Sequence, residues 1–172
     1  MLPKYLMRRL FISILLIFCA TQAVASARLG VGDPAPNFMA FTLEGKFVSL
    51  YQHYVGQKPV MLVFTATWCH TCLSKIPSLN QLHRELGDRF AILAINLEIR
   101  DSLEDVRAYQ QEHGINYPII FDQGSRMMSA YQVYGTPTHI IIATNGTILY
   151  RSARTPSVDE IQANWAALTA TY

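Results

Sequence analysis

The feature of the sequence that most restricts the fold is a short apolar segment followed closely by two cysteines. Residues 60–64 are all apolar, and Cys69 and Cys72 come shortly after them. Because apolar side chains occupy every position instead of alternating with polar ones, the segment is predicted to be a strand buried on both faces. Beyond the cysteines, leucine and isoleucine recur every three or four residues, which predicts a helix over residues 70–86. The cysteines therefore lie where a strand gives way to a helix.

This position predicts a reactive dithiol. Cys69 would lie at the helix N-terminus, exposed, where unpaired backbone N–H groups and the helix dipole favour a thiolate over a thiol. Cys72 would lie one turn further on, within reach of a disulfide with Cys69. We expect Cys69 to attack as the nucleophile and Cys72 to resolve the mixed disulfide. A purely structural disulfide is the alternative, but closing so short a loop removes little chain entropy.

The first 25 residues have the pattern of a secretory signal peptide. Three basic residues precede an apolar stretch at residues 10–20, and small residues follow at 23–27. A basic start, a short apolar core and a small-residue exit are typical of cleaved export signals. An uncleaved membrane anchor is the alternative, although its apolar core is short for a bilayer. We therefore expect residues 1–25 to be removed and the protein to work in the periplasm or another extracytoplasmic compartment.

Without this segment the chain is close to neutral. Its removal takes three of the 14 Lys and Arg residues, which leaves 11 against 12 Asp and Glu. No run of basic residues remains, so the sequence gives no reason to expect nucleic-acid binding. Removal also takes Cys19, so that Cys69 and Cys72 are the only cysteines of a domain expected to span residues 28–172.

Apolar periodicity alternates between strand-like and helix-like along this domain, and turn signals such as Asn145-Gly146 separate the segments. Alternating strands and helices followed by an antiparallel hairpin predict an α/β sandwich around a mixed sheet. The predicted strands cover residues 38–42, 47–50, 60–66, 90–97, 117–121, 138–143 and 147–151, and the predicted helices cover residues 51–55, 70–86, 103–113, 122–132 and 156–168.

Several motifs together resemble the thioredoxin fold. The sequence Trp-Cys-His-Thr-Cys at 68–72, with Pro77 shortly after it, looks like a thioredoxin-fold active site. The segment 45–60 and the sequence Tyr-Gly-Thr-Pro-Thr at 134–138 are similar to the TlpA/ResA-like branch of extracytoplasmic thiol–disulfide oxidoreductases. The resemblance covers residues 31–150. It implies a thioredoxin-like sandwich, with a central mixed sheet flanked by helices and an N-terminal β-hairpin.

The resemblance also implies an activity and its substrate contacts. It implies thiol–disulfide exchange with protein substrates, acting as a reductase, without a metal or an organic cofactor. The partners would be protein thiols and disulfides and a membrane redox protein of the DsbD type, and we expect a monomer. Thr136-Pro137 matches the family's cis-proline, where the main chain of Thr136 would pair with an extended substrate. Trp68 would shield the disulfide and form a docking surface, or would simply pack.

Two departures from the family leave the proton acceptor of Cys72 open. Thioredoxin has a buried acid where this chain has Val63, and ResA-like members often have Glu where it has Lys75. Water or another group must then accept the proton. Glu98, near the end of the predicted strand at residues 90–97, is the nearest candidate by sequence, although an ordinary loop carboxylate is the favoured interpretation. His139 could lie near the disulfide, or could be a strand-face histidine without a redox role.

His70, between the cysteines, could tune their chemistry. A protonated imidazole beside a thiolate stabilises the reduced form and makes the disulfide more oxidising, whereas a ring in solvent would do little. Other functions remain open for the same cysteines. A copper-handling protein would need a further soft or imidazole ligand. A redox sensor or chaperone would show no turnover. A peroxiredoxin would need a Thr-x-x-Cys site, but Ala66 stands at the threonine position.

Overall fold

The computed structural model describes residues 28–170 of the 172-residue chain. The predicted signal peptide, residues 1–25, lies outside the described range. Within that range no helix combines the length and the hydrophobicity that a membrane crossing requires.

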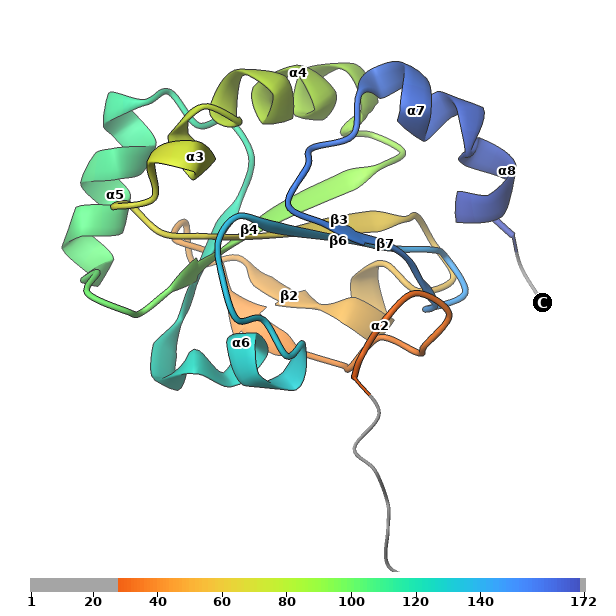
Figure 1. Ribbon diagram of the computed structural model, residues 1–172, viewed down its shortest axis with the longest axis horizontal. Coiled ribbons are helices and arrows are strands. Elements are labelled where there is room, and N and C mark those ends of the chain that lie inside the picture. The colour runs from red at the N-terminus through yellow and green to blue at the C-terminus, as the bar shows by residue number, and fades with distance from the viewer. Residues whose placement is uncertain (1–27, 171–172) are drawn as a thin grey trace, which may run out of the picture.

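A five-stranded mixed sheet forms the centre of the molecule (Figure 1). Its strand order is β5-β4-β3-β6-β7, with β3 to β5 parallel to one another and β6 and β7 antiparallel to their neighbours. The predicted mixed sheet is therefore confirmed. Its strands are β3 (Val60–Thr65), β4 (Ala91–Leu97), β5 (Ile119–Asp122), β6 (Thr138–Ile142) and β7 (Ile148–Ser152).

Helices cover one face of this sheet. The side chains of Met61 and Val63 pack there among leucines of the long helix that follows the cysteines. The helices that contribute to this core are α4 (Ile76–Leu86), α5 (Leu103–Glu112), α7 (Val158–Ala163) and α8 (Trp165–Leu168).

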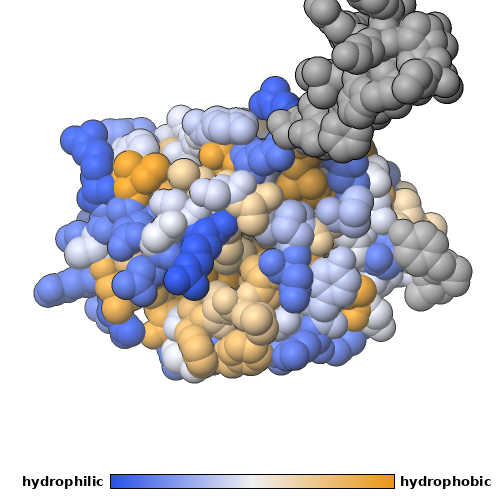
Figure 2. Space-filling view, turned by 90° about the horizontal axis from the view of Figure 1, so that it is seen from below, coloured by the Kyte–Doolittle hydropathy of each residue, from blue (hydrophilic) through white to orange (hydrophobic). Residues whose placement is uncertain are grey.

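The opposite face is covered by an N-terminal hairpin and two short helices (Figure 1). Leu62 and Phe64 pack on this side, so that β3 is buried on both faces, as its apolar sequence predicts. The covering elements are β1 (Met39–Phe41), β2 (Phe47–Ser49), α2 (Leu50–His53) and α6 (Arg126–Ala130). This side of the molecule also exposes hydrophobic side chains, among them Met39 and Phe41 of the hairpin (Figure 2).

Three predicted helices differ from the observed ones. The helix expected over residues 70–86 is divided into α3 (His70–Leu73) and α4, and Pro77 is the second residue of α4. Proline lacks an N–H and clashes with the preceding turn, so it is tolerated at a helix start and divides a longer helix. The last helix is likewise divided at Asn164, between α7 and α8.

The third difference lies at residues 122–132. Asp122 ends β5, and a 3-10 turn (Gln123–Ser125) precedes α6. The Asp122 carboxylate accepts hydrogen bonds from the main-chain N–H groups of Met127 and Met128, at 2.9 and 2.8 Å. This carboxylate begins the helix four residues later than the sequence pattern indicates.

Candidate active site

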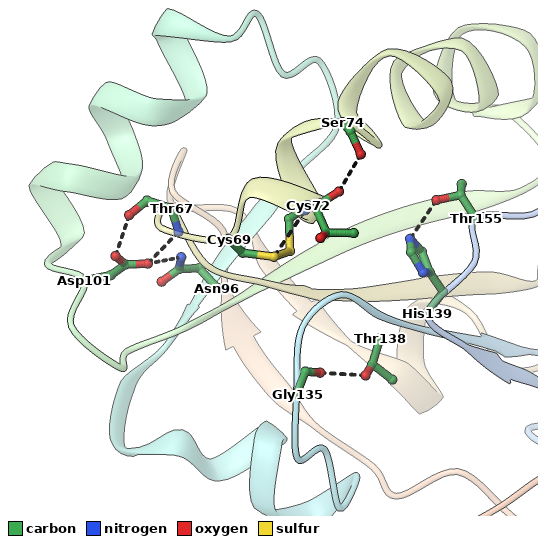
Figure 3. Close-up of a disulfide and its surroundings, with 11 residues drawn as sticks. Thr67, Cys69, Cys72, Ser74, Asn96, Asp101, Gly135, Thr138, His139 and Thr155 are labelled. Atoms are coloured by element: carbon green, nitrogen blue, oxygen red, sulfur yellow. Dashed lines mark hydrogen bonds between the residues drawn. A yellow bond between two sulfur atoms is a disulfide. The ribbon is translucent and has the colours of Figure 1, made fainter.

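The two cysteines form a disulfide at the end of β3 (Figure 3). Cys69 precedes the first residue of α3 and Cys72 lies within it, with 5.2 Å between their Cα atoms. The main-chain N–H of Cys72 donates a hydrogen bond to Cys69 Sγ, at 3.1 Å. A donor at this position would stabilise negative charge on Cys69 after reduction.

The environment of Cys69 differs from the prediction in two respects. The prediction of an exposed sulfur is wrong in the disulfide form, because Cys69 is only 7% exposed and Cys72 only 5%, and both pack against Ala66. The predicted helix dipole is also smaller, since α3 has four residues. The N–H group of Cys72, and not the dipole of a long helix, is the donor placed to stabilise a Cys69 thiolate.

A buried carboxylate that the sequence reasoning missed holds the loop before Cys69. Asp101 accepts hydrogen bonds from the N–H (2.9 Å) and the hydroxyl of Thr67 and from the side-chain amide of Asn96 (2.7 Å) (Figure 3). Asp101 does not cap α5, because the next residue, Ser102, fills that role with a capping box. Asn96 is the residue from which this buried polar site could have been predicted, because it is the one polar residue in the apolar run of β4.

Trp68 and His70 lie at the surface on either side of Cys69. Trp68 is 46% exposed, and its indole N–H donates to the carbonyl of Ile99 at 2.7 Å. This hydrogen bond fixes the ring beside the cysteines and leaves part of it open to solvent. His70 is exposed at the first position of α3.

The segment 134–138 lies next to the cysteines because β6 pairs with β3. Thr138 of β6 is opposite Phe64 of β3, and the peptide bond between Thr136 and Pro137 is cis. None of the described residues pairs with the main-chain N–H or C=O of Thr136. Pro137 is buried and borders both a small cavity at Cys72 and an open groove of about 660 Å³. Tyr134, 82% exposed, also borders the groove.

His139 is brought to the cysteines, whereas Glu98 is not. His139 lies opposite Val63 in the sheet, on the same side as the disulfide, and lines the small cavity with Cys72 (Figure 3). The Glu98 carboxylate instead accepts a hydrogen bond from the N–H of Gly124, in the turn before α6, and does not line that cavity.

His139 is completely buried, and both of its ring nitrogens have partners. Nδ1 lies 3.3 Å from the carbonyl of Ser152, and Nε2 lies 3.0 Å from the hydroxyl of Thr155. The first contact requires the proton on Nδ1, so that Nε2 accepts from Thr155. Burial, opposed by the hydrogen bond to Ser152 and assisted by the positive charge of Lys75, lowers the pKa of His139 to about 4. His139 is therefore neutral at neutral pH.

Comparison with known proteins agrees with this geometry. Residues 31–151 match the AhpC/TSA family. The thioredoxin-like protein YneN of Bacillus subtilis is 33% identical over 130 residues, which are 74% of this chain and 75% of that protein. The thiol-disulfide oxidoreductase ResA of Bacillus subtilis is 29% identical over 153 residues, 83% of either chain.

A solved structure shares both the fold and the sequence pattern. The crystal structure of a thiol:disulfide interchange protein of the thioredoxin family from Chlorobium tepidum superimposes with a TM-score of 0.65 at 26% identity, covering 81% of this chain and 97% of that chain. The predicted thioredoxin-like fold is thus confirmed. The family, the relatives and the Cys69–Cys72 disulfide agree on the chemistry. The chain belongs to the AhpC/TSA family of thioredoxin-like proteins and, within it, to the ResA-like thiol–disulfide oxidoreductases.

Proposed function

We propose that the protein reduces disulfides of protein substrates outside the cytoplasm, with Cys69 as the nucleophile and Cys72 as the resolving thiol. The observation that carries the assignment of roles is the hydrogen bond from the N–H of Cys72 to Cys69 Sγ. This donor stabilises the thiolate of Cys69, and the thiolate is the form that attacks a disulfide.

The reaction has two exchanges. The Cys69 thiolate attacks one sulfur of the substrate disulfide, the substrate S–S bond breaks, and the departing thiolate takes a proton. Cys72, as a thiolate, then attacks Cys69 Sγ and releases the second substrate sulfur, which also takes a proton. Two electrons pass to the substrate, and the protein is left with the Cys69–Cys72 disulfide that the structure contains.

The main chain of Thr136 is the proposed anchor for the substrate. Its unpaired N–H and C=O groups border the groove beside Pro137, and an extended segment could pair with them as an added strand. The exposed ring of Trp68 would contact the substrate from the other side of Cys69. These contacts place the substrate disulfide against Cys69.

The proposed location and partner are supported by the sequence pattern and by the family resemblance. The signal-peptide pattern of residues 1–25 supports export, with the domain at residues 28–172 acting outside the cytoplasm as a monomer. A reductase there needs a source of two electrons for each turnover. We propose a membrane protein of the DsbD type, which would return the Cys69–Cys72 disulfide to the dithiol.

Trapping and turnover test this proposal together. Cys72→Ser should accumulate mixed disulfides with protein substrates. Cys69→Ser should abolish the reduction of insulin by the protein in an assay with dithiothreitol as the electron donor. Iodoacetamide should label Cys69 faster than Cys72 in the reduced protein, and the reverse order would exchange their roles. In cells, a mostly reduced pair, trapped by alkylation, supports the reductase direction, and a mostly oxidised pair indicates an oxidase.

The same experiments separate the alternatives. A redox sensor or a chaperone with this cysteine pair would give no insulin turnover in the intact protein. A copper-handling protein would bind Cu(I) tightly through the reduced pair, and a titration of the dithiol form would show it. Either result in place of turnover would contradict the proposed function.

A further inference from the structure

A small cavity adjoins Cys72 on the side of the sheet that carries the helices. Its volume is about 20 Å³, enough for one water molecule. Half of the side chains in its wall are apolar, and the polar or titratable side chains that line it besides Cys72 are those of Thr65, Lys75, Tyr109, Tyr117 and His139. The electrostatic environment of the second sulfur is therefore set by few groups.

Lys75 is the one cation among these lining residues. It is half-buried, three residues after Cys72, and its main-chain N–H donates to the carbonyl of Cys72 at 2.9 Å. Among the described residues its ammonium has no carboxylate within ion-pair distance. Its charge reaches the interior, because it lowers the pKa of His139, which lies on β6 across the cavity.

The other lining groups are neutral at neutral pH. His139 has a lowered pKa and both ring nitrogens in hydrogen bonds. Burial raises the pKa of Tyr109 and that of Tyr117. Two carboxylates, Asp101 and Glu112, act on Tyr109 and help to raise its pKa, but neither lines the cavity.

A thiolate at Cys72 would thus face one unpaired positive charge and no lining acid. Cys72 is almost fully buried, and burial disfavours its thiolate. A nearby opposite charge, such as that of Lys75 in the lining of the same cavity, has the reverse effect, and little solvent reaches this side of the sulfur to screen it. Burial disfavours a positive charge on His139, and both of its ring nitrogens are already in hydrogen bonds, so it is poorly placed to act as a base.

We propose that the Lys75 ammonium stabilises the thiolate of Cys72, so that the resolving sulfur ionises without a dedicated proton acceptor in the protein. This rests on the proposed exchange function and supplies its second step. The Cys72 thiol releases its proton to water, and the thiolate forms a bond to Cys69 Sγ. The bond between Cys69 and the substrate sulfur breaks, and the departing thiolate takes up a proton from water, so that protons and electrons balance.

The pKa of Cys72 measures this effect directly. In a reduced Cys69→Ser background of the full chain, the pH dependence of iodoacetamide labelling gives the pKa of Cys72, read by peptide mass spectrometry so that Cys19 is not counted. Lys75→Met should raise this pKa by about one unit, and Lys75→Glu should raise it further. Lys75→Arg should keep it low. Lys46→Met, in the turn of the hairpin, makes the same change in net charge away from the cavity and should leave the pKa unchanged.

The rate of resolution gives a second readout in the protein with both cysteines. At neutral pH, Lys75→Met should slow the release of substrate thiol from a preformed mixed disulfide by about threefold. The thiolate fraction falls about tenfold per pKa unit, but the nucleophilicity of the remaining thiolate rises and offsets part of the loss. A smaller loss in Lys75→Arg than in Lys75→Met supports the role of the charge.

Two results would overturn the inference. One is an equal Cys72 pKa in Lys75→Met, Lys75→Glu and Lys46→Met. The other is a pKa that rises in Tyr109→Phe but not in Lys75→Met, which would assign the stabilisation to the tyrosine hydroxyl. The pKa of Cys72 is measured in all of these variants without a protein substrate. A failure of the inference is therefore distinct from a failure of the proposed function, which would appear as absent insulin turnover with any residue at position 75.

Discussion

At the scale of single residues, two histidines near the disulfide have opposite surroundings. His70 projects into solvent from the first position of α3, whereas His139 is buried in β6 with both ring nitrogens in hydrogen bonds. Burial disfavours a positive charge on His139 and lowers its pKa. Of these two histidines, His70 is the one that faces solvent next to Cys69, and His139 is the one whose protonation is linked to folding.

Replacing His70 tests its influence on the redox couple. A cationic His70 adds to the N–H of Cys72 in stabilising the Cys69 thiolate, so we expect a Cys69 pKa below that of a free thiol and a potential above the roughly −270 mV of thioredoxin. His70→Asn should raise the Cys69 pKa and make the couple more reducing. Equilibration with glutathione gives the potential. A value at or below that of thioredoxin, unchanged in His70→Asn, would show that His70 has no effect.

Protonation of His139 should destabilise the fold in acid. Burial lowers its pKa to about 4, below the unfolded value near 6.5, so the unfolded chain binds this proton first. The contribution is fully present above pH 6.5 and is lost as the pH falls toward 4, by about 3 kcal/mol. Urea unfolding of the oxidised protein between pH 4 and 7.5 measures it. His139→Asn should flatten the profile and His70→Asn should not, and equal slopes in all three proteins would contradict the assignment.

At the scale of elements, the position of the cysteines depends on a tie between two loops. Asp101, after β4, binds Thr67, between β3 and α3, and also binds Asn96 within β4. The loop that leads into the short helix α3 is thus held at two points: by the end of β3 and by this carboxylate. The next residue, Ser102, begins α5 through its own capping box and does not touch the cysteine loop.

Substitutions at Asp101 and Ser102 separate the positioning of the cysteine loop from the capping of α5. Asp101→Asn leaves buried donors of Thr67 and Asn96 facing an amide, which should cost about 1–3 kcal/mol of unfolding free energy and should also slow insulin reduction. Ser102→Ala removes a helix cap, costs about 1 kcal/mol, and should leave exchange unchanged. Urea titration and insulin turnover of both variants provide the comparison. Equal turnover in the two variants would mean that the tie does not position Cys69.

At the scale of the whole molecule, the sheet places two distant segments side by side. The cysteine loop follows β3, and the Thr136-Pro137 segment precedes β6, which is antiparallel to β3. Both segments therefore reach the same edge of the sheet although they are far apart in sequence (Figure 1). Pro137 completes the arrangement, because it borders both the cavity at Cys72 and the open groove.

Substitution of Pro137 should impair substrate handling more than folding. Pro137→Ala removes the ring that borders both the cavity and the groove, so we expect kcat/KM for insulin to fall on the order of tenfold, about the value of one substrate hydrogen bond. Exchange with a small disulfide such as 5,5′-dithiobis(2-nitrobenzoic acid) should change little. Pro156→Ala, next to α7, serves as the control. An equal loss with both disulfides would mean that Pro137 acts on the cysteines and not on substrate binding.

The features that depend on local sequence pattern were predicted from the sequence. The features that depend on contacts between distant segments were not. The uninterrupted apolar run of β3 and the Cys-x-x-Cys spacing identified the central strand and the disulfide. The break between α3 and α4 lies at residues 74–75, just before Pro77, although helical periodicity continues across it. The burial of Cys69 and the tie at Asp101 arise where separate loops pack together, and no periodicity records such contacts.

The antiparallel pairing of β3 with β6 also has a consequence for when this protein can act. Hydrogen bonds between the two strands hold the reactive sulfur and the free main chain of Thr136 at a fixed separation. In the proposed role, a substrate cysteine must bring with it a stretch of backbone whose own N–H and C=O groups are unused. Cysteines in folded helices and central strands do not meet that condition, because the main-chain groups around them are already hydrogen-bonded. The protein would therefore work on newly exported or unravelled chains, and the completion of folding in a substrate would itself end the opportunity for exchange.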